Sequence, residues 1–178
     1  HQPALRAGEL VYACREQAAA LFGVDEPERV VFTLNATHAL NTAIHALAKP
    51  GAAVAVTGYE HNSVMRPLAA LGCRTMVMRA PLFDQEEAVR AAERAAASGA
   101  ELFIVNHVSN VFGFVQPLER IDALLTQAGI PMILDASQSA GVLPIDCGRL
   151  HSLAALCCPG HKALYGPQGT GILLVRSD

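Results

Sequence analysis

The segment AALCCPGHKALYGPQGTG, residues 154–171, largely decides how the chain is interpreted. Its apolar start predicts a buried strand, which breaks at residues 159–160 and presents Lys162 on a loop before a second apolar run over residues 172–175. Ligands of parallel sheets bind beyond the carboxyl ends of the strands, so a lysine at this point is well placed to meet one. We expect apolar neighbours to strip water from its ammonium group, which favours the neutral amine that attacks a carbonyl.

The placement of Lys162 is informative because lysine is rare in this sequence. Lys49 is the only other lysine, and the remaining basic residues are arginines. Lys49 lies in a turn-like Lys-Pro-Gly sequence rather than at the end of an apolar run. The alternative for Lys162 is a solvated loop lysine, and the rest of the sequence has to decide between the two interpretations.

Composition predicts one well-packed domain. The chain has 178 residues, of which 52% are apolar and only 16% charged, as in globular domains with a substantial core. A net charge of −3 without a basic cluster argues against a nucleic-acid partner. The apolar runs are too short to cross a bilayer, which argues against a membrane partner, and no signal-peptide pattern opens the chain. The sequence begins with histidine, so we expect a piece of a longer protein.

The five cysteines do not form a disulfide framework. Their odd number and irregular spacing indicate reduced thiols and a cytoplasmic location. Cys158 and His161 have a chelate-like spacing, but no second ligand pair accompanies them, so we expect no metal site. Cys157 and Cys158 are better interpreted as small buried apolar residues.

Strand and helix patterns alternate along the chain. Apolar periodicity predicts helices over residues 5–22, 37–47, 63–71, 84–97 and 117–128, the first of them amphipathic with Leu10, Val11, Cys14, Ala18 and Leu21 near helical spacing. Short apolar runs predict strands over residues 29–33, 52–57, 74–78, 102–106, 132–134, 154–158 and 171–175. This order favours an α/β fold with a mostly parallel sheet. The last strand follows its predecessor too closely for a helical crossover, so we expect that pair to be antiparallel.

Polar residues collect where the predicted strands end. Since the carboxyl ends of parallel strands share one edge, these side chains can converge on one pocket: Thr37, His38, His61, Asn110, Asp135, Gln138, His161 and Lys162. Each has a simpler alternative, such as a helix cap for His61 or Asp135 and a turn residue for Asn110. Every one of these alternatives would have to hold separately.

The set suits pyridoxal phosphate. This cofactor needs a lysine for a Schiff base, a carboxylate facing the pyridine nitrogen and a phosphate cradle, for which the helix start at Thr37 offers free N–H groups and a hydroxyl. Other nucleotide and hydrolase motifs are absent from the sequence: it contains no P-loop, no early dinucleotide-binding glycine motif and no nucleophile elbow.

Five ordered motifs resemble the class V aminotransferase superfamily, in its cysteine desulfurase and selenocysteine lyase branch. They are TLNATHALN (33–41), EHNS (60–63), HVSN (107–110), LDASQ (134–138) and the lysine loop, GHK (160–162) with GPQGTG (166–171). The resemblance covers nearly the whole chain. It implies the large domain of the fold type I pyridoxal-phosphate-dependent transferases, a three-layer sandwich.

The resemblance also implies roles around the cofactor ring. Lys162 would form the Schiff base and then move protons at the substrate Cα, so it is the first catalytic candidate. His61, the second, would stack on the ring face. Asp135 would pair with the pyridinium nitrogen, and Gln138 would donate a hydrogen bond to the ring oxygen.

The remaining implied roles concern the phosphate and the substrate. Ala36 through its backbone, Thr37 and His161 would hold the phosphate, and Asn110 would help to bind the substrate carboxylate. The family often has serine or threonine two residues before the histidine of the lysine loop, where this chain has Pro159, so one phosphate donor is missing.

Family members are about twice as long as this chain, as expected when a longer chain divides into domains. The resemblance therefore implies that residues 1–178 are a partial large domain, without the N-terminal segment and the small C-terminal domain. That small domain supplies the substrate-carboxylate arginine and, in desulfurases, the catalytic cysteine, and none of the five cysteines here matches its position.

The implied reaction removes sulfur from L-cysteine to give alanine and a persulfide, in an enzyme that is usually a homodimer. The alternatives are a transaminase or another lyase of the same superfamily, or an inactive fragment that still binds the cofactor.

Overall fold

The computed structural model describes residues 2–176 and shows an α/β fold with one seven-stranded sheet. Its helices are α1 (Gln2–Leu21), α2 (Ala36–Leu47), α3 (Asn62–Ala70), α4 (Gln85–Ala97) and α5 (Leu118–Ala128), with short 3-10 turns at Pro27–Arg29 and Cys147–Arg149. Its strands are β1 (Val30–Thr33), β2 (Ala53–Val56), β3 (Arg74–Val77), β4 (Leu102–Asn106), β5 (Met132–Asp135), β6 (Leu153–Pro159) and β7 (Gly171–Val175).

The sheet has the strand order β1-β7-β6-β5-β4-β2-β3. Strands β3, β2, β4, β5 and β6 pair in parallel, whereas β7 is antiparallel to both β6 and β1. This confirms the mostly parallel sheet and the antiparallel final pair. Because β7 alone runs the other way, the carboxyl ends of the other six strands lie at one edge of the sheet.

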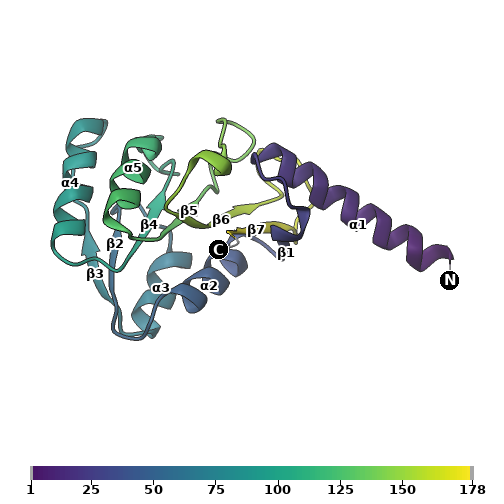
Figure 1. Ribbon diagram of the computed structural model, residues 1–178, viewed down its shortest axis with the longest axis horizontal. Coiled ribbons are helices and arrows are strands. Elements are labelled where there is room, and N and C mark those ends of the chain that lie inside the picture. Colours follow the sequence, from purple (N-terminus) through teal and green to yellow (C-terminus); the bar gives the residue numbers. More distant parts are fainter. Residues whose placement is uncertain (1, 177–178) are drawn as a thin grey trace.

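Helices cover both faces of the sheet, which makes a three-layer sandwich. Figure 1 shows α4 and α5 on one side and α2 and α3 on the other. Two groups of buried side chains fill the spaces between the layers, one under α4 and α5 and one under α2 and α3. Strands β2, β4 and β5 are buried at every position, as expected for central strands covered on both faces.

Helix α1 forms as predicted, but most of it does not pack on the sheet. It extends away from the body of the molecule (Figure 1), and only Ala18 and Ala19 in its last turns are buried. Leu5, Leu10 and Val11 are exposed. Of the apolar residues predicted at helical spacing, Ala18 is buried, whereas Leu10 and Val11 are exposed.

No helix within residues 2–176 is long and apolar enough to cross a membrane. Within the same range, no group of three or more histidine, cysteine and acidic side chains is arranged to hold a metal ion.

Candidate active site

One pocket lies at the carboxyl edge of the sheet. It encloses about 550 Å³, open solvent at its mouth included. The structure brings the eight residues with an implied cofactor or substrate role to its lining: Ala36, Thr37, His61, Asn110, Asp135, Gln138, His161 and Lys162. His38 does not line it; the ring of His38 accepts a hydrogen bond from the backbone N–H of Leu34 instead.

Asp135 forms the buried end of the pocket. It is the last residue of β5 and is only 2% exposed. One carboxylate oxygen accepts a hydrogen bond from the backbone N–H of Ser137 at 3.0 Å, and the other accepts from the side-chain amide of Asn106 at 3.5 Å. No helix follows it directly, so the helix-cap alternative is wrong, and its carboxylate is held in place by Asn106 on the adjacent strand and by Ser137 in the turn after β5.

The N-terminus of α2 forms a second wall. Asn35 is the N-cap, and its side-chain oxygen accepts a hydrogen bond from the N–H of His38 at 2.8 Å. Ala36 and Thr37 follow the cap, and their N–H groups precede the first intrahelical hydrogen bond. Free N–H groups and the positive end of the helix dipole together favour an anion.

Close backbone packing fixes this helix start. Gly171 of β7 pairs with Thr33 of β1. A Cβ at position 171 would lie 2.6 Å from the carbonyl carbon of Asn35 and 2.7 Å from the Thr33 hydroxyl, so only glycine fits. The end of the lysine loop and the entry to α2 are thus pressed together.

The lysine loop connects β6 to β7 and is held through its backbone. The N–H of Gly160 donates to the carbonyl of Thr170, and the N–H of Gly166 donates to the carbonyl of Gly160. A Cβ at Gly141, which follows the Asp135 segment, would lie 2.8 Å from the carbonyl oxygen of Ala163. The loop position is therefore set by contacts that leave no room for side chains.

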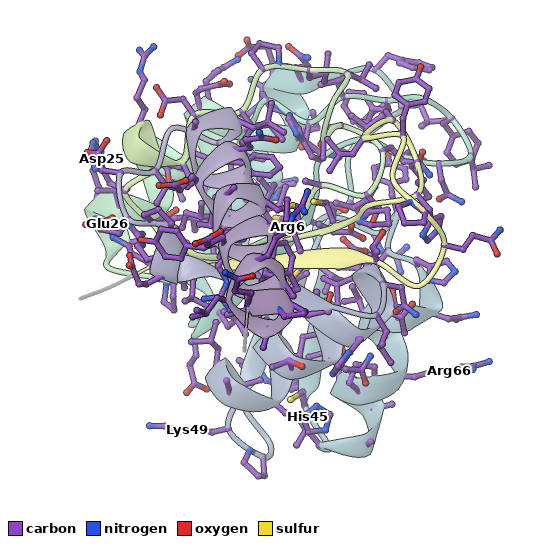
Figure 2. The ribbon with its side chains drawn as sticks, turned by 90° about the vertical axis from the view of Figure 1, so that its right-hand side faces the viewer. Arg6, Asp25, Glu26, His45, Lys49 and Arg66 are labelled. Carbon is purple, nitrogen blue, oxygen red and sulfur yellow. The ribbon has the colours of Figure 1, made fainter. Side chains whose placement is uncertain are left out.

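Lys162 itself is exposed, so the expected apolar packing around it is wrong. Its side chain makes no hydrogen bond or ion pair with any residue in 2–176, and the pocket beside it is lined mostly by polar residues. Leu164 of the same loop packs against the core cluster under α4 and α5, whereas Lys162 faces solvent beside the pocket. Lys49 lies elsewhere, pointing away from the body of the molecule in Figure 2.

His61 both caps a helix and lines the pocket. It is the N-cap of α3, and its Nδ1 accepts a hydrogen bond from the N–H of Ser63 at 3.1 Å. The capping alternative and the placement at the site therefore hold together. With Nδ1 accepting, the neutral ring carries its proton on Nε2.

The loop before His61 is organised by Glu60. The Glu60 carboxylate accepts hydrogen bonds from the hydroxyl and N–H of Thr57 and from the N–H of Gly58. Burial raises the pKa of Glu60, against these hydrogen bonds, which favour the ionised form. Glu60 thus closes the turn that leads from β2 to His61.

Asn110 lies in a turn after β4, as its simpler alternative predicted, and it also lines the pocket. Aromatic side chains beside it connect two loops of the site. The ring of Tyr59 meets Phe112 edge-on at 6.1 Å and Phe114 at 5.8 Å. The loop that carries Asn110 is thereby packed against the loop that carries His61.

Sequence reasoning missed four of the pocket residues: Asn35, Ser63, Asn106 and Ser137. Asn35, Ser63 and Ser137 lie inside the quoted motifs. The motifs therefore indicated these parts of the pocket, but the site roles were predicted for neighbouring residues. Asn106 had been taken only as the end of a strand. Pro159 also lines the pocket, where its side chain offers no donor.

Three cysteines, Cys157 and Cys158 buried and Cys147 half-buried, have thiols with a raised pKa. Cys157 and Cys158 are fully buried in β6, which confirms that they act as small apolar residues. Burial raises the pKa of Cys147 and of Cys158 to about 12 and that of Cys157 well above its ordinary value, with Asp135 adding to the shift in the last two. Since the thiolate is the nucleophile, none of these three is reactive near neutral pH.

Known proteins match the chain along its whole length. The sequence model of the family "Aminotransferase class-V" matches residues 1–178. The cysteine desulfurase IscS of Serratia proteamaculans is 36% identical over 183 residues, which cover 99% of this chain and 44% of the relative. The chain thus spans less than half the length of this curated relative.

Solved structures agree with this match. The apo cysteine desulfurase of Thermococcus onnurineus has a TM-score of 0.88 at 29% identity, over 99% of this chain and 45% of that one. A variant of C-DES with glycine covalently linked to its PLP cofactor has a TM-score of 0.88 at 25% identity, over 98% of this chain and 48% of that one. The chain therefore belongs to the class-V aminotransferase family, in its cysteine desulfurase branch.

Proposed function

We propose that residues 1–178 form the cofactor-binding large domain of a pyridoxal-phosphate-dependent cysteine desulfurase. The observation that carries this proposal is the meeting of three groups in one pocket: the buried carboxylate of Asp135, the N-terminus of α2 and Lys162 on its glycine-packed loop. The relatives named above support the choice of reaction. The chain spans 44% of the first of them, so the activity belongs to a protein that includes further residues.

The residues present fit pyridoxal phosphate. Asp135 would face the pyridine nitrogen, and its buried, hydrogen-bonded carboxylate suits a protonated ring nitrogen. The N–H groups at the start of α2, with Thr37 and His161, would hold the phosphate. Asn106 supports the fit as well, because it lines the pocket and its buried side-chain oxygen has no partner within residues 2–176.

When bound, pyridoxal phosphate supplies an electron sink for a negative charge at the substrate Cα. The chain's own residues do the rest. Lys162 would hold the cofactor covalently and then take and return the proton at Cα, for which its exposed, unpaired side chain is free to move. His61 would cover one face of the ring, Gln138 would donate a hydrogen bond to the ring oxygen, and Asn110 would orient the substrate carboxylate.

The overall reaction moves the sulfur of L-cysteine to an acceptor thiol. The C–S bond breaks, a new S–S bond forms on the acceptor, and the amino acid leaves as alanine after Cβ gains a proton. The acceptor thiolate has to be accessible, which excludes Cys147, Cys157 and Cys158 because burial raises the pKa of each thiol. We propose that the acceptor thiol belongs to none of these three cysteines.

We also propose a homodimeric protein of the cytoplasm. The exposed apolar side chains of α1, such as Leu5 and Leu10, support a packing partner for that helix. The five cysteines are unpaired, which supports a reducing compartment.

The test is product analysis after L-cysteine is added to the protein loaded with pyridoxal phosphate in the presence of a thiol. Alanine and sulfane sulfur in equal amounts would support the desulfurase. Pyruvate and ammonia would instead identify a lyase, and amine transfer that needs a keto acid would identify a transaminase. Cofactor binding with none of these products would mean that residues 1–178 bind the cofactor without turning over.

A further inference from the structure

Asn106 is a buried amide in the wall of the pocket. It is the last residue of β4, it is only 4% exposed, and it pairs in register with Asp135 on β5. Its Nδ2 donates to Asp135 Oδ2 at 3.5 Å, while its Oδ1 has no partner within residues 2–176. Asn106 lines the same pocket as Lys162.

The orientation of the amide follows from its neighbour. A carboxylate only accepts hydrogen bonds, so the NH₂ end of Asn106 has to face Asp135, and the carbonyl end has to face elsewhere. A buried acceptor without a donor is unfavourable. An acceptor of this kind in a pocket wall points to a donor that arrives with a ligand.

We propose that Asn106 is a positioning residue that sets the carboxylate of Asp135 for the pyridine nitrogen, an inference that rests on the proposed function. Asp135 Oδ1 is tied to the N–H of Ser137 in its own loop, and Oδ2 is approached by Asn106 from the adjacent strand. Donors from two elements hold the plane of the carboxylate. The free Oδ1 of Asn106 adds a second acceptor beside it for the protonated ring edge.

A purely structural role is the competing explanation, in which Asn106 only links β4 to β5. The two explanations differ in what the change Asn106→Leu does, since leucine has a similar volume and no polar atoms. A structural link predicts lower stability and unchanged cofactor binding. A positioning role predicts weaker binding and altered ring orientation, in addition to the loss of stability that either explanation predicts when Asp135 Oδ2 loses this donor.

The experiment titrates pyridoxal phosphate into residues 1–178 and into Asn106→Leu. Ser139→Ala is the matched control, since the Ser139 hydroxyl is fully buried and unpartnered within residues 2–176 but does not line the pocket. We expect Asn106→Leu to raise the Kd about tenfold and to change the induced circular dichroism of the bound cofactor. Ser139→Ala is expected to leave both unchanged.

A double-mutant comparison tests whether Asn106 acts through Asp135. In the Asp135→Asn background, the same Asn106→Leu change is expected to have a smaller effect on the Kd and the dichroism than in the parent. An equal factor in both backgrounds, or an unchanged Kd in the single variant, would overturn the inference while leaving the proposed function intact. Failure of the unmutated chain to bind the cofactor would contradict the proposed function and the inference together.

Discussion

The two ends of the pocket are built in different ways. Asp135 ends a central strand, is 2% exposed and accepts hydrogen bonds from Ser137 and Asn106. Lys162 stands on a loop beyond the sheet and is exposed, with no side-chain partner within residues 2–176. Hydrogen bonds at the end of the sheet thus fix the Asp135 carboxylate, whereas backbone packing of the loop fixes the position of the Lys162 backbone but not that of its amine. A site can be set at one end by side-chain contacts and at the other by backbone packing alone.

The largest expected effect is a difference in the free energy of unfolding between substitutions at Asp135 and at Lys162. Asp135→Ala leaves the buried amide of Asn106 and the partly buried N–H of Ser137 without their acceptor, and we expect the free energy of unfolding to fall by about 3 kcal/mol. Lys162→Ala removes an exposed side chain and is expected to change it by less than about 0.5 kcal/mol. Urea unfolding of both variants measures the difference. An equal loss of unfolding free energy in the two variants would contradict the claim that side-chain contacts fix Asp135 but not Lys162.

Backbone packing at the lysine loop is tested by Gly171→Ala. The new Cβ would collide with Asn35 and Thr33, so we expect a loss of about 2 kcal/mol and a displaced start of α2. Binding of pyridoxal phosphate should weaken more than binding of pyridoxal, which has no phosphate. Gly8→Ala is the control: it lies in α1 with no atom near the added methyl group, and it is expected to stabilise by about 0.5–1 kcal/mol. Similar stability in both variants would contradict this account of the loop.

The smallest effect concerns the pH dependence of the loop before His61. Burial raises the pKa of Glu60, so the folded chain keeps this proton to higher pH than the unfolded chain. Its contribution to stability is therefore greatest below the ordinary glutamate pKa and is lost as pH rises through the raised value. The free energy of unfolding of the parent, minus that of Glu60→Gln, should fall as pH rises above the ordinary glutamate pKa.

An exposed glutamate serves as the control for this titration. The hydrogen bond and charge of Arg120 lower the pKa of Glu86, so the parent minus Glu86→Gln difference should change in the opposite direction with pH. A Glu60 difference that rises with pH would mean that the hydrogen bonds from Thr57 and Gly58 outweigh burial.

The sheet was predictable because its strands carry the signal in their own residues. The apolar runs at 102–106 and 171–175 coincide with β4 and β7, and the short connection to β7 required an antiparallel pair. Convergence of the polar residues followed from the same logic, since parallel strands end at one edge. The roles of these residues stay predictions, because they depend on a ligand rather than on the fold.

The remaining features depend on tertiary contacts that local patterns do not encode. Helical spacing predicted α1 but could not tell whether anything covers Leu5 or Leu10. The exposure of Lys162 depends on which residues of its loop pack against the core. Asn106 entered the site only through its register with Asp135, a contact between residues that are 29 positions apart in the chain.

The most direct test of the central claim is to identify the residue that holds pyridoxal phosphate. The chain is incubated with the cofactor, reduced with borohydride, digested and examined by mass spectrometry, alongside Lys162→Ala and Lys49→Ala. We predict one reduced adduct on Lys162, present in Lys49→Ala and absent from Lys162→Ala, with a visible absorbance band that follows the same pattern. Labelling of Lys49 as strongly as Lys162, or no adduct in a folded sample, would contradict the claim that this pocket is a pyridoxal phosphate site.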